Sequence, residues 1–279
     1  MAKLLAIDGM ALARRIFEAT ELLPPGLTPE QASPAQRDDH AQRAIVHMRA
    51  SFTRLLNSQS PSHVVLAFDH GGPTWRHALY PLYKAQRHPM PASLRQHLPA
   101  FYETLQQWGL QVLIIPDVEA DDVIATGVTR WLQEQRGEAV IASSDKDLHC
   151  LIAQGALVLD HFKNEVRDRN WVEQKFGVGP ELLPDLLALV GDAADNIPGV
   201  SKIGLKTAAK LLRAYGSLDG VLAGAGILSD AIGQRLRAGR EQLNLSRQLV
   251  QLKTDVTLGV SWSKLAWQVN VEGMGGASC

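Results

Sequence analysis

The chain has 279 residues, of which 46% are hydrophobic, and its formal net charge is −1. A chain of this length is expected to form one large domain, or one domain with a small addition. It contains no apolar run of about 18 residues, which excludes a membrane-spanning helix. Its two cysteines form neither a disulfide framework nor a zinc-binding spacing, so we expect a reducing, cytoplasmic setting. The N-terminal residues show no signal-peptide pattern.

Short apolar segments in the first half of the chain are typical of buried strands, and they lie at residues 4–7, 64–68, 112–116 and 139–142. Helical patterns lie between them, for example at residues 40–56 and about 118–133, whereas the proline-rich residues 24–38 predict a loop. Continuous apolar strands separated by helices predict an α/β fold, in which helices cover both faces of a central, mainly parallel sheet.

The sequence divides into three expected regions. Residues 1–170 are predicted to form the α/β core, residues 171–255 a mainly helical region, and residues 256–279 a tail. A glycine-containing hairpin between two helices is predicted at about residues 190–213.

Acidic residues follow each predicted strand. Because the carboxyl ends of parallel strands meet at one edge of a sheet, these side chains are expected to converge on one acidic pocket. A further pair, Asp192 and Asp195, lies three residues apart and would share one face of a helical turn. The full candidate set is Asp8, Asp69, Glu119, Asp121, Asp122, Asp145, Asp147, Asp192 and Asp195.

So many carboxylates near one pocket could not all stay ionised without cations. Oxygen ligands without histidine or cysteine favour Mg²⁺ or Mn²⁺ over zinc. Two such ions about 4 Å apart can activate water and stabilise the leaving oxygen of a phosphodiester, which is nuclease chemistry. Any one of these acids alone could equally be a helix cap or a loop acid, and Asp121 and Asp122 lie in a first helical turn, where acids are favoured anyway.

The hairpin has the features of a phosphate-binding turn. Gly199 and Gly204 allow a tight turn and a close approach of the backbone to phosphate. The helix predicted after Gly204 has its positive end at this turn. Lys202, Lys206 and Lys210 are spaced four apart and line one edge, although they could also form an ordinary solvated helix face. The pattern predicts salt-sensitive binding that does not depend on base sequence.

Residues 70–102 contain no acid, and basic residues alternate there with aromatic ones such as Trp75, Tyr80 and Tyr83. This combination suits a single-stranded nucleic acid, with charges for the backbone and rings for stacking on bases. The alternative is a solvated basic surface with ordinary core aromatics. The basic residues are Arg76, Lys84, Arg87 and Arg95, together with His70, His77, His88 and His97.

Two groups of motifs resemble the 5'-nuclease (flap endonuclease) family, over about residues 4–255. The hairpin resembles its helix-three-turn-helix motif, in Gly191-Asp192-x-x-Asp195-Asn196-Ile197-Pro198-Gly199-Val200 and Ile203-Gly204-x-Lys206-Thr207-Ala208. The acidic motifs resemble those of the family in the same order, in Ile7-Asp8-Gly9, Phe68-Asp69, Glu119-Ala120-Asp121-Asp122, Asp145-Lys146-Asp147 and Gly191-Asp192-x-x-Asp195-Asn196. The chain looks most like the stand-alone bacterial branch and also resembles the 5'-nuclease domain of DNA polymerase I.

The resemblance implies a PIN-like core with a helical arch at about residues 70–100, and two Mg²⁺ ions that Mn²⁺ can replace. It assigns the first ion to Asp8, Asp69, Glu119, Asp121 and Asp145, and the second to Asp145, Asp147, Asp192 and Asp195. Asp121 is the first choice as a ligand, and Asp122 either assists the ligands or starts a helix. Lys84 and Arg87 would contact the scissile phosphate, so the implied catalytic residues are Lys84, Arg87, Asp121 and Asp145.

The resemblance also implies one K⁺ ion at the hairpin, held by the main-chain carbonyls of Leu189, Val190, Pro198, Val200 and Ile203. The implied DNA contacts are Lys202, Ile203, Gly204, Leu205, Lys206, Thr207 and Lys210.

The expected function is a magnesium-dependent, structure-specific 5' flap endonuclease, for which 5'-3' exonuclease activity stays open as a second activity. It would be a monomer without an organic cofactor or a membrane partner, acting on branched DNA with a 5' single strand. Three alternatives remain: a DNA-binding protein that recognises junctions without cutting, a ribonuclease of the related acidic α/β type, and the nuclease domain of a DNA polymerase.

Overall fold

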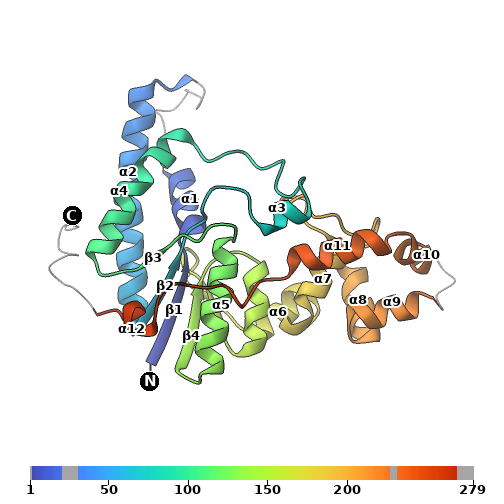
Figure 1. Cartoon of the computed structure of the whole chain (residues 1–279). Coiled ribbons are helices and arrows are strands. Elements are labelled where there is room, and N and C mark those ends of the chain that lie inside the picture. Colours follow the sequence, from blue (N-terminus) through green and yellow to red (C-terminus); the bar gives the residue numbers. More distant parts are fainter. Residues whose placement is uncertain (1, 21–30, 227–230, 269–279) are drawn as a thin grey trace.

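The computed structural model describes residues 2–20, 31–226 and 231–268 (Figure 1). The elements of the core are β1 (Ala2–Asp8), α1 (Gly9–Ala19), α2 (Pro34–Gln59), β2 (His63–Ala67), α3 (Trp75–Leu79), α4 (Ala92–Gln107), β3 (Val112–Leu113), α5 (Ala120–Gln133), β4 (Gly137–Ala142), η2 (Asp147–Gln154), β5 (Leu157–Asp160) and β6 (Glu165–Arg167). The helical region follows with α6 (Arg169–Phe176), η3 (Pro180–Leu182), α7 (Leu183–Val190), α8 (Leu205–Tyr215), α9 (Leu218–Ala225), α10 (Ala231–Ala238), α11 (Arg240–Val250) and α12 (Trp262–Leu265).

The six strands form one sheet in the order β3-β2-β1-β4-β5-β6. All neighbours are parallel except β5 and β6, which form an antiparallel pair at one edge. The predicted α/β fold with a mainly parallel sheet is therefore confirmed. The sequence analysis missed β5 and β6, which are only 4 and 3 residues long and carry little periodicity.

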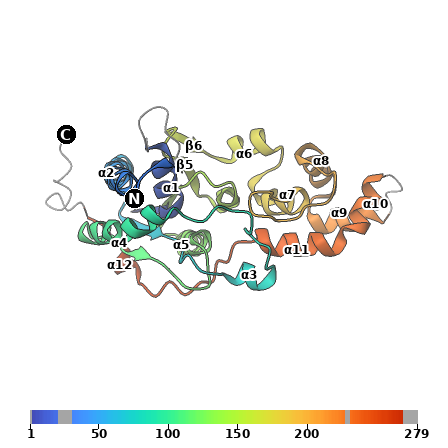
Figure 2. The ribbon, with the colours of Figure 1, turned by 90° about the horizontal axis from the view of Figure 1, so that it is seen from above.

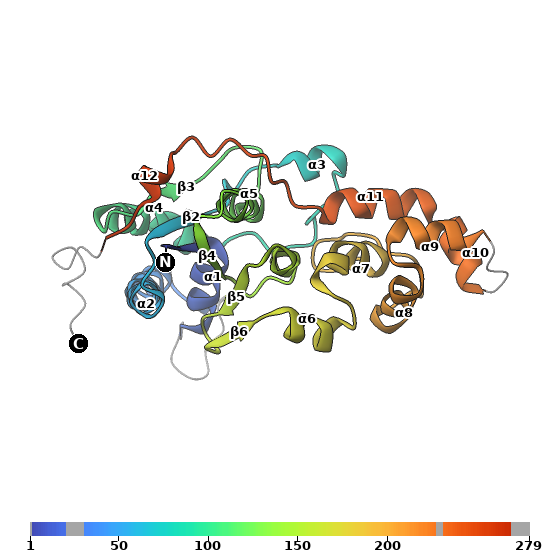
Figure 3. The ribbon, with the colours of Figure 1, turned by 90° about the horizontal axis from the view of Figure 1, so that it is seen from below.

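Alternate residues of the central strand β1 enter two separate cores. Leu4 and Ala6 face the core that contains α5, whereas Leu5 and Ile7 face the core that contains α1, α2 and α4. All four side chains are fully buried, which explains why the strand is a continuous apolar run. Figures 2 and 3 show the sheet and its helices at one end of the molecule and α7 to α11 at the other.

Helix α2 begins earlier than predicted, because the proline-rich segment before it contains a helix start. The side chain of Ser33 accepts a hydrogen bond from the Gln36 N–H, the Gln36 side chain accepts one from the Ser33 N–H, and Pro34 occupies the first turn. The predicted loop at residues 24–38 is therefore wrong for residues 34–38, while residues 24–30 lie outside the described part. Strand β3 is shorter than the predicted 112–116, because only Val112 and Leu113 pair with β2.

The hairpin between α7 and α8 depends on two glycines. Gly191 has a φ of +76°, a conformation that favours glycine. A Cβ on Gly199 would lie 2.2 Å from the carbonyl oxygen of Val190, so only glycine lets the backbone pass. Helix α11 packs against α7 and brings the chain back toward the core.

Among the described residues, no helix has both the length and the apolar character that a membrane crossing requires.

Residues 251–268 form a strap that runs from the end of α11 along α5 to β2 (Figure 3). The backbone N–H of Val256 donates to Thr126 Oγ1 at 3.2 Å, and that of Trp267 donates to the carbonyl of Ser62 at 2.9 Å. Val256 and Trp267 are both buried. These contacts correct the predicted tail for residues 256–268, which carry no periodic pattern yet pack on the core; residues 269–279 lie outside the described part.

Replacing Trp267 tests whether the strap stabilises the core. We expect Trp267→Ala to lower the free energy of unfolding by about 3–5 kcal/mol, because a buried indole is removed together with its hydrogen bond to the Trp108 carbonyl. Thr257→Ala, an exposed position on the same strap, should leave stability within about 0.5 kcal/mol. Denaturant unfolding of both variants measures this, and equal stabilities would contradict a docked strap.

Candidate active site

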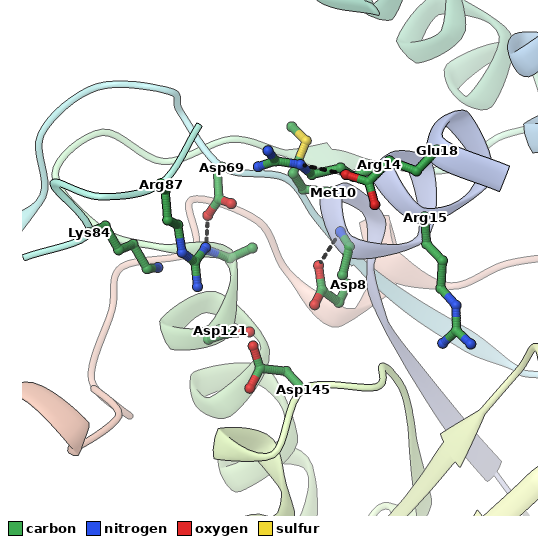
Figure 4. Close-up of a pocket in the computed structure, with 12 residues that line it drawn as sticks. Asp8, Met10, Arg14, Arg15, Glu18, Asp69, Lys84, Arg87, Asp121 and Asp145 are labelled. Carbon is green, nitrogen blue, oxygen red and sulfur yellow. Dashed lines mark hydrogen bonds and ion pairs between the residues drawn. The ribbon is translucent and has the colours of Figure 1, made fainter. Parts of the chain in front are cut away.

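A polar pocket of about 450 Å³ opens at the carboxyl edge of the sheet. Figure 4 shows carboxylates from four separate segments around it, with two cations from the segment after α3. The predicted site residues that line it are Asp8, Asp69, Lys84, Arg87, Asp121 and Asp145. The structure thus brings together acids that lie up to 137 positions apart, 145 − 8, in the sequence.

Hydrogen bonds to the ends of the strands orient these carboxylates. Asp8 ends β1, and its carboxylate accepts from the N–H of Ala11 at 2.9 Å and from the hydroxyl of Ser143 at 3.0 Å. Asp69 follows β2 and accepts from the N–H of Ala120 at 2.9 Å, so it also caps α5. Asp8 is therefore held by the start of the next element, α1, as strand-to-helix turns favour. Asp69 is held instead by the start of α5, which lies farther along the chain.

Burial and mutual repulsion perturb the acids of the pocket. Burial raises the pKa of Asp8 to about 7, and the charges of Asp69 and Asp145 add to the effect. Burial followed by the charges of Asp145 and Asp8 raises the pKa of Asp121 well above its ordinary value. Carboxylates in such a pocket favour either protons or a bound cation.

A second group of acids begins at Asp145. Burial, then the charge of Asp145, raises the pKa of Asp147 to about 7. Lys146 lies between the acids, with its Nζ bonded to Asp192 and 3.7 Å from Asp147. Burial by itself raises the pKa of Asp192, but Lys146 and the backbone N–H groups of Ala194 and Asp195 together lower that pKa below its ordinary value. Asp145 lines the pocket and its carboxylate also accepts from the N–H of Asp147 at 3.0 Å, so the two groups of acids meet at this residue.

Asp122 does not face the pocket. Its side chain is 0% exposed, and both oxygens accept from the guanidinium of Arg76, at 2.8 and 3.0 Å. They also accept from the indole of Trp75 and the N–H of Lys253, both at 2.9 Å. The metal-ligand assignment of Asp122 is corrected, because its oxygens are already saturated by donors inside the protein.

Glu119 and Asp195 contact cations and a buried tyrosine at the pocket. The Glu119 carboxylate accepts from Lys84 Nζ at 2.5 Å and from the Tyr83 hydroxyl at 3.0 Å. Asp195 is paired with Arg87 and lies 3.9 Å from Lys84 Nζ. Lys84 and Arg87 therefore lie at the pocket, where the sequence predicted them.

The aromatic residues of the basic segment do not form a stacking surface as a group. Tyr83 is 3% exposed and its hydroxyl binds acids, so it cannot stack on a base. The ring of Trp75 is in contact with Arg76 and Lys253, at 4.4 and 4.9 Å from its centroid. The stacking prediction fails for Tyr83 and is weakened for Trp75, since packing and internal hydrogen bonds use these groups.

The donor chemistry fits a hard divalent ion, since every acid in the two groups offers carboxylate oxygens. In the described part of the chain, however, no three acidic, histidine or cysteine side chains are grouped closely enough to hold an ion as they stand. Lys84, Arg87 and Lys146 contact these acids instead. Metal binding would therefore require the acids to exchange these internal cations for the ion.

The sequence analysis missed the wall that helix α1 contributes to the pocket. Its residues there include Arg14, Arg15 and Glu18. Arg14 donates to the carbonyl of His88 at 3.1 Å, which connects α1 to the basic segment. The signal that could have found Arg15 is the helical spacing from Asp8, because a residue 7 positions later lies two turns along on the same side of a helix.

The residues whose carbonyls are predicted to hold K⁺ lie at the end of α7 and in the loop between α7 and α8. The carbonyl of Leu189 accepts from Val200 N–H at 2.8 Å, and that of Val200 accepts from Ile203 N–H at 3.0 Å. The carbonyl of Pro198 accepts from the hydroxyl of Ser246 on α11. Among the predicted DNA contacts, Lys202, Gly204, Leu205, Lys206 and Lys210 are exposed and Thr207 is half-buried, whereas the side chain of Ile203 is buried, so only its backbone could contact DNA.

The fold and the pocket together define an α/β protein of the acidic nuclease class with a helical C-terminal region. Residues 3–177 match the family model described as the 5'-3' exonuclease N-terminal resolvase-like domain, and residues 178–272 match the 5'-3' exonuclease C-terminal SAM fold. The chain belongs to the 5'-3' exonuclease family.

Curated relatives support this assignment over nearly the full length. Flap endonuclease Xni from Psychromonas ingrahamii is 33% identical over 96% of this chain and 98% of its own. Flap endonuclease Xni from a Shewanella species is 37% identical over 94% of both chains. DNA polymerase I from Thermus thermophilus is 35% identical over 98% of this chain, which spans 31% of the polymerase.

Solved structures show the same fold. The bacteriophage T5 5'-exonuclease with bound zinc has a TM-score of 0.71 at 21% identity, covering 99% of this chain and 98% of that one. A bacteriophage T5 flap endonuclease complex with DNA and metal ions has a TM-score of 0.69 at 20% identity, covering 89% and 88%. The catalytic core of Rad2 with DNA substrate has a TM-score of 0.57 at 16% identity, covering 99% and 85%.

The raised pKa of Asp8 predicts a pH-dependent stability. The folded protein keeps a proton on Asp8 up to about pH 7, whereas the unfolded chain releases it near 3.8. Without divalent ions, the stability that protonated Asp8 contributes to the folded state is fully present below pH 3.8 and is lost as the pH rises through 7. Asp8→Asn removes the charge, so we expect a higher Tm than wild type at pH 8, by about 3 °C per kcal/mol of relieved repulsion.

Thermal unfolding in a chelator at pH 4 and pH 8 measures the difference. Asp168→Asn is the matched control, because Asp168 is also a helix N-cap, accepts from Trp171 N–H at 2.9 Å and is exposed. The two variants should differ at pH 8 and converge toward pH 4. A lower Tm for Asp8→Asn at pH 8 would contradict the assigned repulsion.

Proposed function

We propose that this protein is a structure-specific 5' flap endonuclease that hydrolyses DNA phosphodiester bonds at the junction of single strand and duplex. The observation that carries the proposal is the meeting of two groups of acids at Asp145, next to the cations Lys84 and Arg87. Membership of the 5'-3' exonuclease family, with flap endonucleases at 33–37% identity, supports it. The proposal includes a monomer that acts in the cytoplasm without an organic cofactor.

The proposed cofactors are two Mg²⁺ ions, for which Mn²⁺ can substitute. When bound, such ions activate water and stabilise a leaving oxygen. The first group of acids, Asp8, Asp69, Asp121 and Asp145 with Glu119, would hold one ion, and Asp145, Asp147, Asp192 and Asp195 would hold the other. The supporting observation is the raised pKa of Asp8, Asp121 and Asp147, since burial and mutual repulsion favour cation binding.

Lys84 and Arg87 supply the positive charges of the pocket that would bind a phosphate. In the structure they are paired with Glu119 and Asp195, so their charges lie at the rim of the acidic pocket. A phosphodiester that enters the pocket offers these cations an anionic partner, while a divalent ion takes the carboxylates. The two cations would then hold the phosphate and stabilise the charge that develops on its oxygens.

The hairpin is the proposed grip on the duplex. The exposed Lys202, Lys206 and Lys210 and the N-terminal end of α8 face away from the core, and helix N-termini favour phosphate. We propose that one K⁺ ion bridges the hairpin carbonyls and the DNA backbone. Supporting this, the carbonyls belong to the end of α7 and to the loop that follows it. An ion there would replace the hydrogen bonds that the carbonyls of Leu189, Pro198 and Val200 accept in the structure.

A 5'-end-labelled DNA flap tests the nuclease activity. We expect the wild type to cut near the junction in Mg²⁺, while Asp145→Asn combined with Asp147→Asn binds the flap and cuts about 10³-fold more slowly or not at all. The reason is that both ion sites lose a ligand, and each metal contributes several kcal/mol of charge stabilisation. Asp168→Asn, an exposed helix cap of the same residue type, should cut like wild type.

Cleavage of an equivalent RNA flap in preference to DNA would favour the ribonuclease alternative. Binding by both proteins without cleavage in Mg²⁺ or Mn²⁺ would contradict the nuclease proposal and favour a junction-binding protein.

The salt dependence of duplex binding tests the hairpin. Each lost phosphate contact should reduce the slope of log K against log salt by about 0.9, so Lys206→Ala with Lys210→Ala is expected to reduce it by up to about 1.8. The loss should be equal on two duplexes of unrelated sequence, because the hairpin contacts only the backbone. Lys264→Ala on α12 is the control, since Lys264 is an exposed lysine outside the hairpin; an equal loss for it would contradict the assignment.

A further inference from the structure

Arg76 is the most completely bonded charged side chain near the pocket. It lies in α3 and is 2% exposed. A guanidinium has five N–H donors, and here its nitrogens make five hydrogen bonds. Nη1 donates to the carboxylates of Glu119 and Asp122, each at 2.8 Å. Nη2 donates to the other oxygen of Asp122 and to the carbonyl of Gln251, each at 3.0 Å. Nε donates to the carbonyl of Leu249 at 2.8 Å.

These bonds join three segments that are far apart in the sequence. Arg76 belongs to the base of the basic segment, Glu119 and Asp122 belong to the start of α5, and the two carbonyls belong to the C-terminal end of α11. The last carbonyls of a helix lack partners within the helix, and a cation there is favoured by the helix dipole. Arg76 therefore completes the end of α11 and neutralises the start of α5 at the same time.

Helix α11 continues the connection to the hairpin. The hydroxyl of Ser246 donates to the carbonyl of Pro198 in the hairpin turn. The strap beyond α11 is bound as well, because the N–H of Lys253 donates to Asp122 at 2.9 Å. A continuous path of buried polar contacts thus runs from Glu119 at the pocket through Arg76 and α11 to the hairpin.

In the observed geometry, every nitrogen of the Arg76 guanidinium has an acceptor. Asp122 is fully buried, so loss of Arg76 leaves an uncompensated charge, which makes any displaced arrangement costly. A lysine at this position would keep the charge but has three donors and no planar fork. It could not hold both carboxylates and both carbonyls together.

We propose that Arg76 is a positioning residue that holds the hairpin region at a fixed distance from the acidic pocket and so determines which phosphodiester bond is cut. The inference rests on the proposed function, in which the hairpin grips the duplex and the pocket cuts the strand. Neighbouring phosphates of one strand are about 3.4 Å apart along the duplex. A comparable displacement of the hairpin relative to the pocket would therefore present the neighbouring bond.

The first readout is the product length on a 5'-end-labelled flap, resolved to one nucleotide. We expect one main product from the wild type, and additional products at neighbouring bonds from Arg76→Lys. Arg167→Lys is the matched control, because Arg167 is also buried and its ion-pair partners, Asp160 and Glu165, both belong to the β5–β6 hairpin. Its guanidinium also contacts His149 and the ring of Trp171, neither of which belongs to α5, α11 or the hairpin between α7 and α8. This control should keep the product pattern of the wild type, even where both variants lose stability, since partial unfolding lowers the rate without moving the cut.

The second readout does not need cleavage. Nitroxide labels at Val46→Cys on α2 and Lys210→Cys on α8, both exposed positions, report the distance between the core and the hairpin region. The native cysteines are replaced by serine in this background. We expect a narrow distance distribution in the wild type and in Arg167→Lys, and a broader or shifted one in Arg76→Lys and Arg76→Met.

The two readouts separate the two claims. A wild type that does not cut the flap contradicts the proposed function. Unchanged distances in Arg76→Met, or an unchanged product pattern in an Arg76→Lys protein that still cuts, overturns the positioning role of Arg76.

Discussion

Carboxylates confined at the carboxyl edge of the sheet repel one another, and much of the polar structure of this protein compensates for that repulsion. Burial keeps Asp8 and Asp147 largely protonated up to about pH 7. The cations Lys84, Arg87 and Lys146 pair with three other acids, namely Glu119, Asp195 and Asp192. The pocket is therefore poised to exchange protons and internal cations for external ones. This exchange suits an enzyme that binds divalent ions and a phosphate in one place. The ions would displace protons and side-chain cations from the carboxylates, and the phosphate would then pair with the released side-chain cations.

Two buried acids near the pocket are paired with arginines inside the protein, unlike the acids that line the pocket. Asp122 is adjacent in sequence to Asp121, yet it turns away and is permanently bonded to Arg76 and Trp75. Asp160 is likewise buried against Arg167. In these positions a fixed guanidinium compensates the charge, so the carboxylate is part of the architecture rather than a site for ions. Glu119 takes part in both environments, since it touches Arg76 on one side and Lys84 on the other.

The two ends of the molecule depend on one another through α11 and the strap. Helix α11 ends against Arg76, and the strap that follows it runs along α5 and reaches β2. The hairpin region is thus attached to the core by polar contacts at the pocket and by buried side chains such as Trp267 farther along. In the proposed function, recognition of the duplex and cleavage of the strand occur at separate places, and these contacts would keep the distance between the two places constant.

The sequence by itself determined the class of fold, the acidic pocket and the hairpin, because each rests on a local pattern. Buried parallel strands are continuous apolar runs, their ends carry the acids, and glycines mark the hairpin turn. Only the tertiary structure decided which of two adjacent acids, Asp121 or Asp122, faces the pocket, since that depends on where Arg76 lies. The same holds for Tyr83, whose ring pattern suggested stacking but whose burial excludes it, and for the strap, whose side chains pack without any periodicity. These outcomes depend on contacts between segments far apart in the chain, and a local pattern carries no information about such partners.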